Sequence, residues 1–218
     1  MMLAMVSWGV GNPIADIAVE HVDPVSVTVI ELVCGLLVFF LVAIAAPPLR
    51  AAIRRVPWRI ALPFGLLQPG LAYLLGNIGW QYGTVTTGAI LMSSEVIFLA
   101  LGGAIFLREK LSAWSVVALF VGVSGAITVG IAGQSSNPET AGQYVTILGF
   151  NVSAGLVGAL AFLGVGMSGA IYGLLMRRLK SEVDTVALTL GQMTAASSLS
   201  VLVLILTQTG IPTPQSVG

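Results

Sequence analysis

Charged, histidine and cysteine residues are scarce in this sequence, and their scarcity excludes several classes of protein. Only 8% of the 218 residues are charged, whereas ordinary soluble domains carry about 25%. The single cysteine, Cys34, excludes an intrachain disulfide and a cysteine-based metal cluster. No Walker A string, dinucleotide fingerprint or paired metal-ligand spacing occurs, so we expect no cofactor, no bound metal, no nucleic acid and no ATP-driven chemistry in this chain.

Long apolar runs take the place of charge, and hydrophobic residues make up 56% of the chain. Each run approaches the roughly 20 residues with which an α-helix crosses about 30 Å of hydrocarbon. The runs are continuous and lack the alternation of β-barrel strands, so we predict an all-α, polytopic transmembrane bundle. The predicted spans are Met1 to Ala18, Val25 to Ala46, Ile60 to Gln81, Thr86 to Leu107, Ala113 to Ala132, Leu156 to Met176 and Val186 to Leu206.

The basic residues predict the orientation of these spans. Lys and Arg near the ends of membrane helices stay on the cytoplasmic side, and here they occupy every second connection. The N-terminus is therefore predicted to be cytoplasmic. The nine basic residues are Arg50, Arg54, Arg55 and Arg59, then Arg108 and Lys110, then Arg177, Arg178 and Lys180.

A short internal repeat predicts two inverted halves. Residues 22–29 (VDPVSVTV) match residues 183–190 (VDTVALTL) at four of eight positions. These copies begin the second and the seventh span, so five spans separate them. An odd number of spans inverts the second unit relative to the first, and inverted repeats are characteristic of secondary transporters. We therefore expect a five-helix repeat over residues 1–132, an external linker over 133–150 and the first two helices of a second repeat over 151–218. Three spans of that repeat are missing, so the chain is either a fragment of a ten-span protein or a protein that compensates by association, for instance as a homodimer.

Two acidic residues, Glu31 and Glu95, lie deep within apolar spans. An ionised carboxylate at mid-membrane costs roughly 2.5 to 3.5 kcal/mol on insertion scales, so we expect both to bind substrate or protons. Glu95 is the leading candidate, because Gly88 and Gly102 on its helical face allow close approach of a helix or ligand. The alternative for Glu95 is a carboxyl group held by a neighbouring serine or another helix. For Glu31, the alternative is a partly solvated vestibule residue near the outer face.

Polar and aromatic side chains in other spans complete the predicted site. Gln192 corresponds to Glu31 through the repeat offset of 161 residues. Trp80 and Tyr82 are interpreted as interface anchors, since Trp and Tyr accumulate at headgroup depth. Buried acids without buried bases favour a cationic or amine-bearing solute, or proton coupling with a neutral one, and disfavour an anion. The remaining candidates for substrate contact are Asn77, Gln81, Asn12, Trp8 and Tyr172.

Three local patterns follow one another in a familiar order: Trp8–Pro13 (WGVGNP), Tyr82–Leu91 (YGTVTTGAIL) and Leu107–Ser112 (LREKLS). In this order they resemble the EamA-type branch of the drug/metabolite transporter superfamily. The resemblance implies a secondary transporter that moves a small metabolite, such as an amino acid or amine, by alternating access across the bacterial plasma membrane. It also implies a small-molecule substrate and membrane lipid as partners, with protons as a further candidate. Two departures, Glu31 in place of a frequent Arg and Val96 in place of Pro, weaken any transfer of substrate from the family.

Other functions compete with the carrier. A channel or a non-transporting membrane scaffold remains an alternative, because pore-lining and carrier sites look alike in one sequence. Residues 166–169 (GMSG) match the Gly-x-Ser-Gly of rhomboid-like serine proteases, but serine chemistry needs a positioned base. The only histidine, His21, falls in an external loop, so a serine hydrolase is disfavoured and we expect no enzyme. Glu109, between two basic residues, is interpreted as a solvated or loop-pinning salt-bridge partner.

Overall fold

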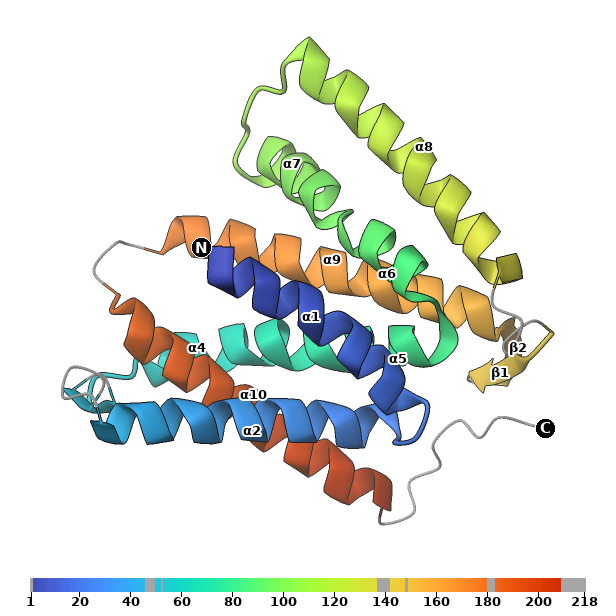
Figure 1. The fold of residues 1–218 in the computed structure, drawn as a ribbon. Helices are drawn as coiled ribbons and strands as arrows, with labels where there is room; N and C mark the ends of the chain where they lie inside the picture. The colour runs from blue at the N-terminus through green and yellow to red at the C-terminus, as the bar shows by residue number, and fades with distance from the viewer. Residues whose placement is uncertain are drawn as a thin grey trace.

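The computed structural model describes residues 2–45, 50–51, 53–136, 142–147, 149–179 and 183–208. Helices dominate this part of the chain, which confirms the predicted all-α bundle (Figure 1). A two-stranded antiparallel hairpin, which the sequence did not predict, precedes α9. The elements are α1 (Met2–Val19), α2 (Pro24–Ala45), α4 (Trp58–Gly65), the π-helical η1 (Leu66–Leu71), α5 (Ala72–Tyr82), α6 (Val85–Met92), α7 (Glu95–Phe106), α8 (Ala113–Ser136), β1 (Tyr144–Ile147), β2 (Phe150–Ser153), α9 (Ala154–Arg178) and α10 (Thr185–Gln208).

Every predicted span falls on a helical segment, with α4, η1 and α5 forming the third and α6 and α7 the fourth. Among the described residues, four segments are long and apolar enough to cross a membrane, and Ala113–Val129 is a shorter apolar helix. These segments make the protein a multi-pass membrane protein, while the count of seven spans stays a prediction. The four are Pro24–Val42, Val85–Phe106, Ala154–Arg178 and Thr185–Thr207.

The third predicted span is interrupted in its middle. Gln68 has φ −142° and ψ 113°, outside the helical region, and Pro69 follows it inside η1. A proline cannot donate the helical N–H bond and drives the residue before it toward extended backbone, which accounts for the break at Gln68. The sequence was read as one continuous span here, although Pro69 marks the position of the break.

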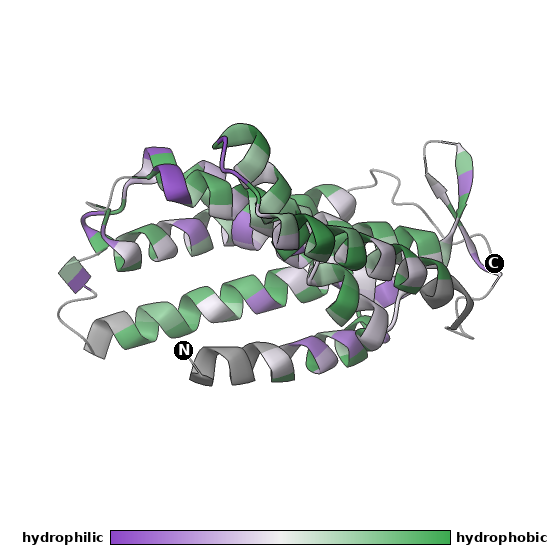
Figure 2. Cartoon of the chain, turned by 90° about the horizontal axis from the view of Figure 1, so that it is seen from above, coloured by the Kyte–Doolittle hydropathy of each residue, from purple (hydrophilic) through white to green (hydrophobic). Residues whose placement is uncertain are grey.

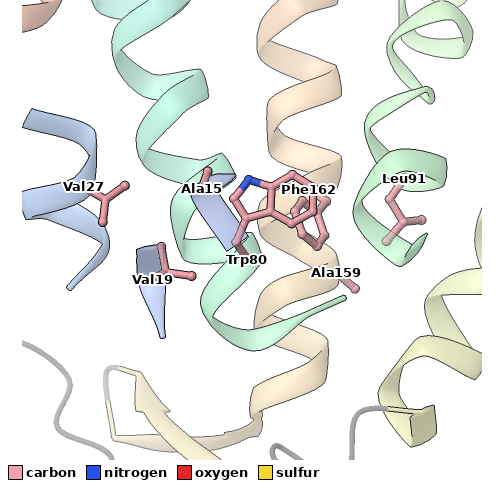
Figure 3. Close-up of a cluster of buried hydrophobic side chains, with 7 residues drawn as sticks. All are labelled: Ala15, Val19, Val27, Trp80, Leu91, Ala159 and Phe162. Carbon is pink, nitrogen blue, oxygen red and sulfur yellow. The ribbon is translucent and has the colours of Figure 1, made fainter. Parts of the chain in front are cut away.

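The centre of the bundle forms around α9, which packs against α5, α6 and α7, whereas α10 packs against α2, α4 and η1 (Figure 1). Phe162 of α9 is fully buried and meets Trp80 edge-on, with ring centroids 4.6 Å apart (Figure 3). Glycines at 79, 83 and 88 leave room for these two rings. Trp80 is only 5% exposed, so its interpretation as an interface anchor was wrong: its ring belongs to the core.

The outer surface of the bundle is apolar, as lipid contact requires. Most of the helical ribbon in Figure 2 carries the colour of hydrophobic residues. Along α8, at the edge of the bundle, Trp114 is 83% and Phe120 74% exposed. Such faces on a water-soluble protein would be extensive aggregation surfaces, whereas in a bilayer they contact acyl chains.

Two of the basic connections meet at one end of the bundle. Glu109 forms a salt bridge with Arg177, with Nη1 3.2 Å from Oε1, and Arg178 donates a hydrogen bond to the carbonyl of Phe106. This confirms that Glu109 is the acidic partner in a loop salt bridge. The start of α4 lies at the same end of the bundle as the C-terminal ends of α7 and α9 in Figure 1.

Candidate functional site

An open cavity of about 360 Å³ lies between α1, α2, α5, α6 and α9. Helix α5 supplies more lining residues than any other helix, and these residues recur at spacings of one and three, so they share one helical face. Val165 brings in α9, which belongs to the predicted second half of the chain. The lining residues are Gly11, Asn12, Ala15, Glu31, Ala72, Tyr73, Gly76, Asn77, Trp80, Met92 and Val165.

Among the described residues that line this cavity, Glu31 is the only acidic one, and it is hydrogen-bonded to a buried amide. The Nδ2 of Asn77 donates to Glu31 Oε2 at 2.8 Å and to Thr28 Oγ1 at 2.9 Å. Thr28 in turn donates to the carbonyl of Pro24 at 2.7 Å. Asn77 is 2% and Thr28 1% exposed, so water does not substitute for these bonds. These hydrogen bonds, from the Pro24 carbonyl through Thr28 and Asn77 to Glu31, are called the relay below. The relay holds the carboxylate of Glu31 at one position in the cavity wall.

The helix that carries Glu31 begins one turn before this relay. Asp23 accepts a hydrogen bond from the backbone N–H of Ser26 at 3.0 Å, as an N-cap residue does, and Pro24 takes the first helical position, which tolerates its missing N–H. The Pro24 carbonyl then lies where the hydroxyl of Thr28, four residues on, reaches it. Of the three side chains in the relay, Glu31 and Asn77 line this cavity, whereas Thr28 lies behind them and lines the neighbouring cavity between α2, η1 and α10.

The structure brings together three of the residues predicted from the sequence, namely Glu31, Asn77 and Asn12. Sequence reasoning missed Tyr73 and Thr28. A signal for both was present in their spacing: Tyr73 lies four residues before Asn77, and Thr28 three residues before Glu31, so each pair shares a helical face.

Glu95, the leading candidate from the sequence, lies apart from this cavity. It begins α7 after the α6 helix ends at Ser93 and Ser94, and its carboxyl group packs across Gly169 of α9. A Cβ atom added at Gly169 would stand 2.6 Å from the carboxyl carbon of Glu95. Met92, one turn earlier, lines the cavity instead.

Gln192 and Tyr172 form a second polar group, between α10 and α9. The Nε2 of Gln192 donates to the hydroxyl of Tyr172 at 3.3 Å, and the ring of Tyr172 meets Phe64 of α4 edge-on at 5.6 Å. Neither residue lines the cavity that contains Glu31. Gln81 is exposed near the end of α5 and also lies outside it. The backbone of Trp8 belongs to α1, but its side chain is outside the described residues.

Two further cavities differ from the first in their lining. One of about 340 Å³ lies between α7, α8 and α9, and one of about 200 Å³ lies between α2, η1 and α10. Apart from single hydroxyls such as that of Ser94, their walls are apolar, and neither contains a carboxylate. Among the three, the Glu31 cavity alone combines a carboxylate, an amide and aromatic walls, which is the pattern of a ligand site.

Ser168, the serine in the protease-like string, has a structural role. Its hydroxyl is buried and donates to the carbonyl of Leu67 at 2.7 Å, next to the break in η1. Buried carbonyl groups released by a helix break need such donors. The Nδ1 of His21 lies 3.2 Å from the carbonyl of Ile17, four residues earlier in the chain, so this ring nitrogen has a local backbone contact.

Known proteins match the chain in sequence. A sequence profile of the EamA-like transporter family matches residues 1–131. An uncharacterized transporter of Bacillus subtilis (strain 168), YvbV, is 24% identical over 193 residues, which cover 88% of this chain and 57% of that protein. The chain thus spans less than two thirds of this relative, and no solved structure matches it. Because the family profile covers more than half of the 218 residues, the chain belongs to the EamA-like transporter family.

Proposed function

We propose that the protein is a secondary transporter that carries a small metabolite, an amino acid, amine or related solute, across the plasma membrane, with the Glu31 cavity as its binding site. The observation that carries the proposal is the carboxylate in an intramembrane cavity. A charged group at this depth is costly and usually marks a substrate or ion path. Family membership supports transport as the activity, and the cavity supports a site for it.

Alternating access is supported by the contrast between the two ends of the third helical segment. Around α5 the bundle is hollow. Around α4 it is closed, because Gly65 packs on the backbone of Gln192 and a Cβ atom at Gly191 would stand 2.5 Å from that of Ala61. A site open on one side and sealed on the other is what one state of such a carrier presents. The break at Gln68 separates the two ends and supplies a hinge.

The charges at the closed end support an orientation for this proposal. The salt bridge between Glu109 and Arg177 joins two basic connections there, and basic connections stay in the cytoplasm. The cavity then opens to the outside, and the N-terminus of α1 is cytoplasmic. We extend the proposal to proton coupling, in which Glu31 exchanges a proton with the substrate during the cycle.

Counterflow in proteoliposomes tests the proposal. The full chain is reconstituted into vesicles preloaded with unlabelled amino acids or amines, and uptake of the labelled solute is followed over time. A carrier shows saturable uptake that preloading accelerates, and Glu31→Gln abolishes it. Glu20→Gln, which removes an exposed carboxylate outside the cavity, is the matched control and leaves uptake unchanged. Uptake that rises linearly with concentration, without acceleration by preloading, would identify a channel instead.

A further inference from the structure

The relay beside Glu31 has a direction that the backbone fixes. The carbonyl of Pro24 can only accept, so the single hydroxyl proton of Thr28 is committed to it over 2.7 Å. The Thr28 oxygen is then left as an acceptor. The group that approaches it from α5 must be the amino end of the Asn77 amide, not its carbonyl end, and its Nδ2 lies 2.9 Å away.

The same amide sets the role of Glu31. The two N–H groups of Asn77 are used by Thr28 and by Glu31 Oε2, at 2.9 and 2.8 Å. Glu31 Oε2 is therefore an acceptor, and Asn77 has no N–H left to offer a ligand. Glu31 lines the cavity, so this corner presents a carboxylate to it. A ligand that binds here must bring hydrogen-bond donors and, to match the carboxylate, a positive charge.

The rest of the cavity fits an apolar body. Trp80, Met92 and Val165 form its far wall, and Gly76 widens it. An apolar cavity of about 150 Å³ already holds a benzene ring. The volume of about 360 Å³ here leaves space for an aromatic ring and a short chain that ends at Glu31.

We propose that this cavity selects an amine with one ammonium group and an aromatic or aliphatic body, and that Thr28 is the positioning residue that sets this preference through Asn77 and Glu31. The inference rests on the proposed function, because it takes the Glu31 cavity as the transport site. An ammonium group donates directly to the carboxylate. A hydroxyl in its place loses the charge-assisted part of the bond, and a carboxylate in its place is repelled.

Three probes of one shape test the preference: 2-phenylethylamine, 2-phenylethanol and 3-phenylpropionate, titrated by calorimetry into the full chain in lipid nanodiscs at pH 7. The amine is expected to bind roughly tenfold more tightly than the alcohol, as a charge-assisted bond exceeds a neutral one by about that factor. Glu31→Gln is expected to remove this difference.

Thr28→Val tests the positioning role, because it keeps the shape and removes the hydroxyl. We expect amine affinity to fall about 3- to 10-fold, the value of one hydrogen bond, with alcohol affinity unchanged. Thr28→Ser restores the amine affinity. The matched control is Thr189→Val, which removes a hydroxyl that bonds the carbonyl four residues earlier in the same way but on the exposed face of α10. It should change neither affinity.

The other outcomes separate the inference from the proposed function. Equal losses for amine and alcohol in Thr28→Val would mean that Thr28 only packs, and would overturn its positioning role. Alcohol or carboxylate binding as tight as amine binding would overturn the ammonium preference but leave the cavity as a site. If no probe binds while Glu31-dependent counterflow of another solute persists, the inference fails and the proposed function stands. If counterflow is also absent, both fail.

Discussion

Two glycines three residues apart in α5 should respond in opposite ways to the same substitution. A Cβ atom at Gly76 would meet Met92 Cε at 3.6 Å and Val165 Cγ2 at 3.9 Å, both ordinary contacts. A Cβ atom at Gly79 would stand 2.5 and 2.6 Å from two ring atoms of Phe162. Gly76→Ala is therefore expected to be tolerated or stabilising, and Gly79→Ala to be destabilising.

The magnitude follows from the space around Phe162. Its ring must retreat by about 1 Å to reach ordinary contact, but it is fully buried and meets the ring of Trp80 edge-on, with centroids 4.6 Å apart. Overpacking of this kind costs about 1 to 3 kcal/mol. The helix propensity gained from Ala over Gly, about 1 kcal/mol in water, enters both variants. It cancels in their difference, which isolates the steric cost at Gly79.

Equilibrium unfolding in mixed detergent and SDS micelles, followed by circular dichroism, measures this difference. Gly79→Ala should unfold with a free energy about 1 to 3 kcal/mol below that of Gly76→Ala. Gly76→Ala also places a methyl group in the Glu31 cavity, so it should weaken binding of a bulky ligand more than that of a small one. Equal unfolding free energies for the two variants would refute the packing of Phe162 against Gly79.

Two further predictions concern the ends of the bundle. The Glu109–Arg177 pair has side chains about half exposed, 52% and 48%, so a double-mutant cycle with Glu109→Gln and Arg177→Gln should give a coupling of about 0.2 to 1 kcal/mol that falls with added salt. A coupling above 2 kcal/mol, insensitive to salt, would contradict a solvated bridge. Asn12→Cys, in a background with Cys34→Ala, should react with an impermeant maleimide added outside intact cells, because the proposed orientation opens the cavity to the outside. Labelling only after permeabilisation would reverse the orientation.

The positions of the helices were predictable because each apolar run is long and bounded by polar or glycine residues. The break at Gln68 was not foreseen, since a hydropathy pattern responds to the average of a run and hardly to one proline. The hairpin β1–β2 was missed for a related reason: its residues lie in the linker between spans. Gly142, shortly before β1, and Gly149, directly before β2, adopt the left-handed backbone at φ 85° and 86°.

Some of the residues that line the Glu31 cavity were predicted from the sequence, while their role in binding stays a prediction. Sequence gives the depth of a residue in the membrane but not the direction in which its helix face points. Glu31, Asn77 and Asn12 lie within predicted spans, and their side chains line the cavity. Glu95 has suitable depth, but the interruption at Ser93 and Ser94 turns its start of α7 toward Gly169. Trp80 likewise has the depth of an anchor, and only its packing on α9 reveals a core residue.

Phe162 packs against glycines that are synthesised earlier in the chain. Gly79, Gly83 and Gly88 are translated and inserted before α9 leaves the ribosome, and their open notch faces lipid or another chain until residue 162 arrives. The first five predicted helices therefore cannot complete their packing alone.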